Sequence, residues 1–160
     1  ARREGLHTDG LWRSGLSANY PLEIVLSAAV GGSNLHRAMM ATVLLIDDER
    51  LVLKQAAAAL AREGLETVTT DEPGLPDGVR PERIDLVLLD VNMPHFFGDD
   101  LIPVLSELGV RAPVYLYSSL DEGRLRDIAQ SAGAAGVISK KLTFSQMADQ
   151  VRTILGAPAP

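Results

Sequence analysis

Four short apolar runs, each followed or closed by a polar or charged residue, constrain the fold of this chain more than any other feature. The runs are residues 43–46, 86–89, 114–117 and 136–139, and stretches of helix-forming residues separate them. Continuous short runs of this kind are typical of strands that are buried on both faces of a parallel sheet. The chain therefore favours a fold in which strands and helices alternate.

Glycines, prolines and helix formers place the remaining elements. Gly64 and Gly109 are positioned to end helices, and Asp99 is placed to cap one. The predicted strands are residues 43–46, 66–70, 85–89, 114–117 and 135–138, and the predicted helices are residues 49–63, 99–108, 121–132 and 143–155. Residues 71–81 hold three prolines and two glycines, which forbid more than about one or two helical turns. We therefore predict an α/β fold, a doubly wound five-stranded parallel sheet of order 2-1-3-4-5, with a shortened or missing second helix.

Polar side chains follow four of the five predicted strands. They are Asp47, Asp48, Asp90, Ser118 and Lys140. Because the carboxyl ends of the strands in such a sheet converge on one crevice, we expect these side chains to share a small volume. Three carboxylates held that close repel one another, so the cluster requires a hard cation. The pattern predicts a magnesium site that handles a phosphoryl group.

The motifs around these residues resemble a response-regulator receiver domain, over residues 42 to about 156. The matching stretches are Asp47-Asp48-Glu49, Asp90 with Met93-Pro94 and Gly98 after it, Tyr117-Ser118-Ser119, and Gly133-Ala134 leading to Lys140. Four motifs in the right order form a specific signal, whereas a single Asp-Asp pair is a weak one. The resemblance implies a flavodoxin-like fold and a chemotaxis-type single receiver of a bacterial, cytoplasmic two-component system or phosphorelay.

The resemblance also implies roles for the acidic residues. Asp90 corresponds to the phosphoacceptor, since a carboxylate can attack a phosphoryl group and form an acyl phosphate. Asp47, Asp48, Asp90 and the backbone carbonyl of Asn92 correspond to the Mg²⁺ ligands. By the family pattern Asp48 binds the ion directly and Asp47 binds it through water, which suits the tendency of magnesium to retain waters.

Two further residues correspond to the family's phosphoryl-binding side chains, and two positions depart from its pattern. Lys140 matches the ammonium that pairs with Asp90 or the phosphoryl oxygens, and Ser118 matches the hydroxyl that bonds the phosphoryl group. Lys141 stands where the family usually has a proline after a cis peptide, so we expect a trans bond. Val137 stands where the family usually has an aromatic residue that rotates inward on activation, so we expect switching to depend on Ser118 and loop movement.

Two functions stay open from these residues. The first is a receiver that takes a phosphoryl group from a sensor histidine kinase or phosphotransfer protein, catalyses its own phosphorylation and dephosphorylation, and signals through a downstream protein partner. With this function we also expect a dimer, formed through the face of the fourth helix, fifth strand and fifth helix. The second is an atypical receiver that binds partners constitutively with little phosphorylation, which Val137 and Lys141 favour. A dehalogenase-type phosphatase is disfavoured because Asn92 stands where that class needs an acid.

Composition and the chain ends restrict the candidate functions further. The chain has 160 residues, 46% of them hydrophobic, no cysteine and a net charge of -6. It can bury the core of one domain, lacks any disulfide or thiolate site, has no basic stripe for nucleic acid and no run that spans a membrane. Residues 1–40 show no sustained hydrophobic periodicity of a helix or a strand. A targeting or partner-binding arm stays open there, but we favour a non-native stretch before a start at Met39 or Met40.

We accordingly expect three segments. Residues 1–40 form an N-terminal extension that is disordered or not native, residues 41–156 form the receiver domain, and residues 157–160 form a tail. The ending Pro158-Ala159-Pro160 also fits the stump of a linker to an output domain.

Overall fold

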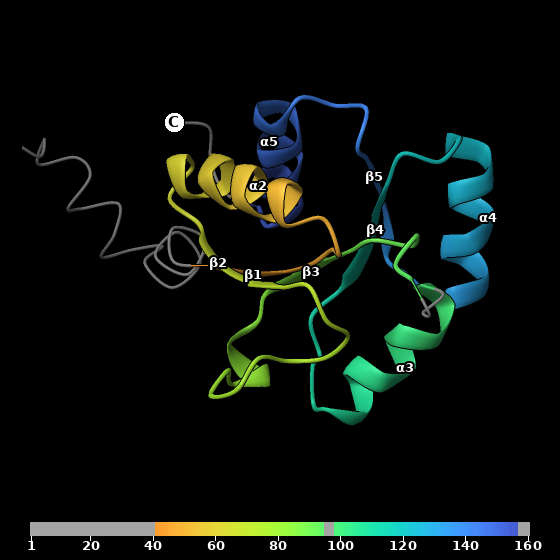
Figure 1. Ribbon diagram of the computed structural model, residues 1–160, viewed down its shortest axis with the longest axis horizontal. Helices are drawn as coiled ribbons and strands as arrows, with labels where there is room; N and C mark the ends of the chain where they lie inside the picture. The colour runs from red at the N-terminus through yellow and green to blue at the C-terminus, as the bar shows by residue number, and fades with distance from the viewer. Residues whose placement is uncertain (1–40, 95–97, 157–160) are drawn as a thin grey trace, which may run out of the picture. The chain divides into compact units, whose positions relative to one another are not determined.

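The computed structural model describes residues 41–94 and 98–156, including backbone alone at Gly98 and Asp99 (Figure 1). Its elements are β1 (Thr42–Ile46), α2 (Arg50–Arg62), β2 (Glu66–Thr70), the 3-10 turn η1 (Pro81–Arg83), β3 (Leu86–Leu89), α3 (Gly98–Glu107), β4 (Val114–Ser118), α4 (Glu122–Ala132), β5 (Gly136–Ser139) and α5 (Phe144–Ile154). The predicted extension, residues 1–40, and tail, residues 157–160, lie outside the described residues, so the proposed segment boundaries stay predictions.

The five strands form one parallel sheet in the order β2-β1-β3-β4-β5. This order confirms the predicted doubly wound sheet. Figure 1 shows α2 and α5 on one face of the sheet and α3 and α4 on the other. Since β1 and β3 occupy the middle of the sheet, the residues that follow them lie at its central crevice. No helix in the described part of the chain is both long and apolar enough to cross a bilayer.

The two central strands, β1 and β3, are apolar at every position except Thr42, because helices cover both of their faces. All residues of β1 and β3 are buried. Successive side chains alternate between two hydrophobic clusters: Val43 and Leu45 point to the cluster shared with α2 and α5, and Leu44 and Ile46 point to the cluster shared with α3 and α4. Fully burying each such side chain stabilises the fold by about 1.5–3 kcal/mol. This burial holds the strand ends in place.

The predicted loss of the second helix is confirmed. Between β2 and β3 the only helical element is η1, three residues with Pro81 in the first position. The segment still covers the sheet, because Leu75 and Val79 pack against the cluster on the α3 and α4 face. Two apolar side chains on a proline-rich segment thus take over part of the covering that a helix would supply. The missing element does not remove either central strand from the core.

Several predicted element ends are wrong by one residue. Helix α3 already begins at Gly98, so Asp99 lies inside the helix and is not its cap. Asp121 and Thr143, predicted as the first residues of helices, are instead N-caps whose side chains accept hydrogen bonds from the backbone of Gly123 and Gln146. Such residues keep non-helical dihedrals while they satisfy the first helical N–H groups. Strand β5 is likewise shifted by one residue, to Gly136–Ser139.

The β4–β5 pairing yields a prediction about Gly136, which lies opposite Tyr115. A methyl group at residue 136 would lie 2.6 Å from Cε1 of the Tyr115 ring, closer than any ordinary contact. We expect Gly136→Ala to lower the free energy of unfolding by about 1–3 kcal/mol, as overpacking does. Urea denaturation measures this, and adding Tyr115→Leu should recover much of the loss. Unchanged stability of Gly136→Ala would mean that the ring moves aside at no cost.

Candidate functional site

Backbone hydrogen bonds between neighbouring strands hold the carboxyl ends of the sheet together. The Asp47 N–H donates to the Thr70 carbonyl at 3.1 Å, and the Asp90 N–H donates to the Ile46 carbonyl at 2.9 Å. The Lys140 N–H donates to the Ser118 carbonyl at 2.8 Å. Each bond is the next rung after a strand ladder, so the sheet register itself decides how these residues face one another. The structure brings all five predicted site residues to this edge.

Three carboxylates gather at the ends of β1 and β3. One oxygen from each of Asp47, Asp48 and Asp90 lies within 4.8 Å of the others. Asp47 and Asp90 are 0% and 4% exposed, whereas Asp48 is exposed. Backbone N–H groups orient the buried pair: Glu49 donates to Asp47 Oδ1 at 2.9 Å, and Asn92 donates to Asp90 Oδ1 at 3.2 Å. The cluster therefore has two buried, oriented carboxylates and one that faces solvent.

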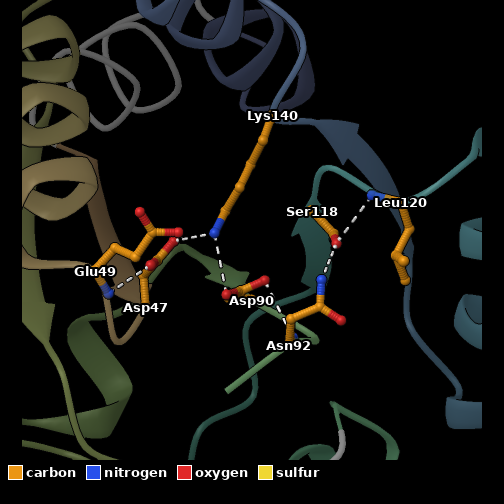
Figure 2. Close-up of polar contacts among 7 residues, drawn as sticks. All are labelled: Asp47, Glu49, Asp90, Asn92, Ser118, Leu120 and Lys140. Carbon is orange, nitrogen blue, oxygen red and sulfur yellow. Dashed lines mark hydrogen bonds and ion pairs between the residues drawn. The ribbon is translucent and has the colours of Figure 1, made fainter. Parts of the chain in front are cut away.

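Lys140 supplies the positive charge between the two buried carboxylates (Figure 2). Its Nζ lies 2.7 Å from Asp47 Oδ2 and 3.0 Å from Asp90 Oδ2. Burial by itself lowers the pKa of Lys140, but the hydrogen bonds to and the charges of Asp47 and Asp90 outweigh it, and the pKa is raised. Burial raises the pKa of Asp47, which the bond to Lys140 offsets only in part. Lys140 is therefore a charged ammonium in a largely buried site.

The Asp47–Lys140 pair was not predicted from the sequence, which paired the ammonium with Asp90 or the phosphoryl oxygens. Asp47 Oδ2 is fully buried, and the Lys140 ammonium 2.7 Å away is the only polar partner found for it among the described residues. A buried carboxylate oxygen with unused acceptor capacity is a suitable partner for a cation or an ordered water. With the neighbouring oxygens of Asp48 and Asp90, the donor set consists of hard oxygens, the type that Mg²⁺ prefers. The residues present thus fit the predicted metal.

Ser118 and Asn92 form a second polar group on the other side of Asp90. The Ser118 hydroxyl is fully buried, and its oxygen accepts from Asn92 Nδ2 and from the Leu120 N–H, each at 3.3 Å (Figure 2). Within the site, the sequence pattern predicted a role for the Asn92 backbone carbonyl but none for its side-chain amide. An amide two residues after a site aspartate was the available signal, but only the tertiary structure shows its partner.

The two positions that depart from the family pattern lie beside this site. The Lys140–Lys141 peptide is trans, as expected, since no described peptide bond is cis. Lys141 is exposed, and its N–H donates to Ser139 Oγ at 3.2 Å. Val137 is partly buried in the α3 and α4 cluster, opposite Leu116 in the ladder. An aliphatic side chain, not a ring, therefore fills that position.

Lys140→Met provides a test of the ammonium's importance. The substitution leaves two buried carboxylates without their positive partner, so we expect the free energy of unfolding to fall by about 3–5 kcal/mol near neutral pH without divalent cations. Because the pKa of Asp47 is raised in the fold, acidification through that pKa protonates it, and the deficit should shrink as the pH falls. Urea denaturation across pH checks both statements. Lys141→Met, the exposed neighbour, is the matched control, and equal stability of the two variants would contradict the expectation.

Comparison with known proteins agrees with this geometry. The sequence pattern of the family described as the response regulator receiver domain matches residues 43–152. The chemotaxis protein CheY of Treponema pallidum is 30% identical over 118 residues, which cover 71% of this chain and 81% of that protein. The probable transcriptional regulatory protein TcrX of Mycobacterium tuberculosis is 29% identical over 115 residues, 71% of this chain but 49% of TcrX. The chain thus spans about half the length of this transcriptional relative.

Solved structures share the fold. A response regulator receiver protein from Burkholderia phymatum superposes with a TM-score of 0.60 and 27% identity, over 75% of this chain and 98% of that one. DrrB of Thermotoga maritima superposes with a TM-score of 0.61 at 24% identity, over 73% of this chain and 53% of that one, which supports the fold alone. The family match, the CheY relative and the shared sheet lead to one conclusion: the chain belongs to the response regulator receiver family, as a domain of the CheY-like type.

Proposed function

We propose that the domain accepts a phosphoryl group on Asp90 from a phosphohistidine of a sensor histidine kinase or phosphotransfer protein, with Mg²⁺, and then binds a downstream protein partner. One observation carries the proposal: Asp90 is a buried carboxylate that contacts the Lys140 ammonium and lies within 4.8 Å of two further carboxylate oxygens. An aspartate that only caps a helix or fills the core does not require a neighbouring ammonium and two further carboxylates. In a chain of this family, they support a phosphoacceptor.

The step moves one phosphoryl group. An Asp90 oxygen attacks phosphorus, the P–N bond to the donor histidine breaks, and the imidazole leaves with the bonding electron pair. Phosphoryl transfer depends mainly on positioning and charge stabilisation. Lys140 would exchange its contact with Asp90 Oδ2 for one with a phosphoryl oxygen. The Ser118 oxygen already accepts from Asn92 and Leu120, so its hydroxyl hydrogen is suited to donate to another phosphoryl oxygen.

The acidic cluster would hold the metal. Asp48 is exposed and suits direct binding, whereas Asp47 is already engaged by Lys140 and suits contact through a water. Asp90 and the backbone carbonyl of Asn92 complete the proposed ligands. When bound, Mg²⁺ would neutralise charge on the phosphoryl oxygens. The ion also relieves repulsion among the three carboxylates, so metal binding and fold stability are linked.

For signalling, phosphorylation would change the surface of the domain, in the cytoplasm. Val137 has no ring to rotate, so the change relies on Ser118 and on the loops after β3, β4 and β5. The face of α4, β5 and α5 remains the proposed dimer surface. The alternative, a constitutive interaction module with little phosphorylation, predicts no covalent chemistry at Asp90. The same experiment therefore separates the two functions.

Metal binding should stabilise the native state. A ligand at about 100 times its dissociation constant adds roughly 2.7 kcal/mol when it binds only the folded chain. Thermal melts with and without millimolar Mg²⁺ should therefore differ for the parent protein, and Asp48→Ala should abolish the difference. Glu49→Gln, an adjacent exposed acid outside the cluster, should retain it. Identical parent melts would contradict the proposed metal site.

Covalent phosphorylation is measured directly by mass spectrometry. Incubation with acetyl phosphate and Mg²⁺ should add one phosphoryl group that is stable in acid and labile in base, as an acyl phosphate is. Asp90→Asn should abolish the addition, whereas Asp71→Asn, which alters a partly exposed acid paired with Arg50, should not. Modification of a different residue would show that Asp90 is not the acceptor. No mass change with any donor would favour the constitutive module.

A further inference from the structure

The ring of Tyr117 lies beside the site, next to the Lys140 ammonium. Tyr117 is the residue before Ser118 in β4, is 1% exposed and belongs to the hydrophobic cluster on the α2 and α5 face. The Lys140 Nζ lies over this ring, 5.5 Å from its centroid. None of the family motifs that led to the proposed function assigns a role to this residue.

The ring gives the ammonium a third partner. Asp47 and Asp90 contact Nζ at 2.7 and 3.0 Å, and the negative face of an aromatic ring attracts a cation within about 6 Å of its centroid. The Lys140 side chain is 12% exposed, so the ammonium depends largely on the groups packed around it for its stabilisation. A flexible lysine stem has many rotamers. Three fixed partners restrict the ammonium to the space between the two carboxylates.

A purely structural role for the ring is less consistent with its surroundings. Tyr115, two residues earlier on the same face of β4, also packs against the α2 and α5 cluster and lies over Gly136. An aromatic side chain thus already covers this face at the neighbouring position. Tyr117 differs in having the Lys140 ammonium above it. The pair of tyrosines provides a matched comparison within one strand.

We propose that Tyr117 is a positioning residue of the phosphoryl-transfer site, whose ring face holds the Lys140 ammonium between Asp47 and Asp90. The inference rests on the proposed phosphorylation of Asp90 for its consequence, but the contact itself exists without phosphate or metal. Because the ring limits the travel of Nζ, the ammonium is ready to contact a phosphoryl oxygen attached to Asp90. Removing the ring should leave Lys140 charged but less well placed.

The rate of phosphorylation by acetyl phosphate, at saturating Mg²⁺, measures the consequence. We expect Tyr117→Leu to slow phosphorylation about tenfold, within the strength of a desolvated cation–π contact. Tyr117→Phe keeps the ring and should stay within about twofold of the parent. Tyr115→Leu removes the matched ring and should also stay within about twofold. Equal rates for Tyr117→Leu and the parent, or equal losses in Tyr117→Leu and Tyr115→Leu, would overturn the inference.

A second measurement does not depend on phosphorylation. In the metal-free protein, the ring current of Tyr117 should shift the NMR signals of the Lys140 ε-methylene. Tyr117→Leu should remove this shift, and Tyr117→Phe and Tyr115→Leu should preserve it. Tyr117→Met serves the same purpose if the leucine variant does not fold. An unchanged Lys140 signal in the variants without the ring would overturn the inference even if Asp90 is phosphorylated. If the parent protein takes no phosphate but the variants without the ring lose the shift, only the proposed function fails.

Discussion

The contact of one ammonium with two buried carboxylates organises this end of the molecule. Lys140 lies 2.7 Å from Asp47 and 3.0 Å from Asp90, and all three groups are largely removed from water. Burying such charges is costly unless they are paired in good geometry. The geometry here comes from the sheet, because Asp47 follows β1, Asp90 follows β3 and Lys140 follows β5. The central strands must therefore be covered and in register before the polar site can form.

This dependence explains why the loss of a helix between β2 and β3 is compatible with an intact site. The degraded segment lies next to the edge strand β2, whereas the buried acids follow the central strands. Leu75 and Val79 keep one face of the sheet covered, so β1 and β3 remain buried on both faces. The altered segment changes the outer surface of the domain and leaves the crevice residues in place.

The site residues differ in how clearly the local sequence pattern predicts them. Asp47, Asp48, Asp90, Ser118 and Lys140 each follow or close an apolar run, and that spacing is enough to place them at one edge of a parallel sheet. The side-chain amide of Asn92 and the ring of Tyr117 carry no comparable signal. Asn92 contacts Ser118, and Tyr117 contacts Lys140, so each acquires its role only from a residue in or directly after another strand. The misplaced cap at Asp99 has a local cause, since helix ends are the least determined part of a pattern.

The sequence alone was enough to predict the α/β class, the strand order and the residues at the carboxyl edge, because burial on both faces demands apolar runs of a recognisable kind. It also determined that residues 71–81 form no full helix, because proline lacks the needed N–H group. Three contacts emerge only in the folded domain: Lys140 bridges Asp47 as well as Asp90, Asn92 donates to Ser118, and the Lys140 ammonium lies over the Tyr117 ring. These contacts join residues 23 to 93 positions apart in the chain. Their distances depend on sheet register and side-chain rotamers, which no periodicity along the chain encodes.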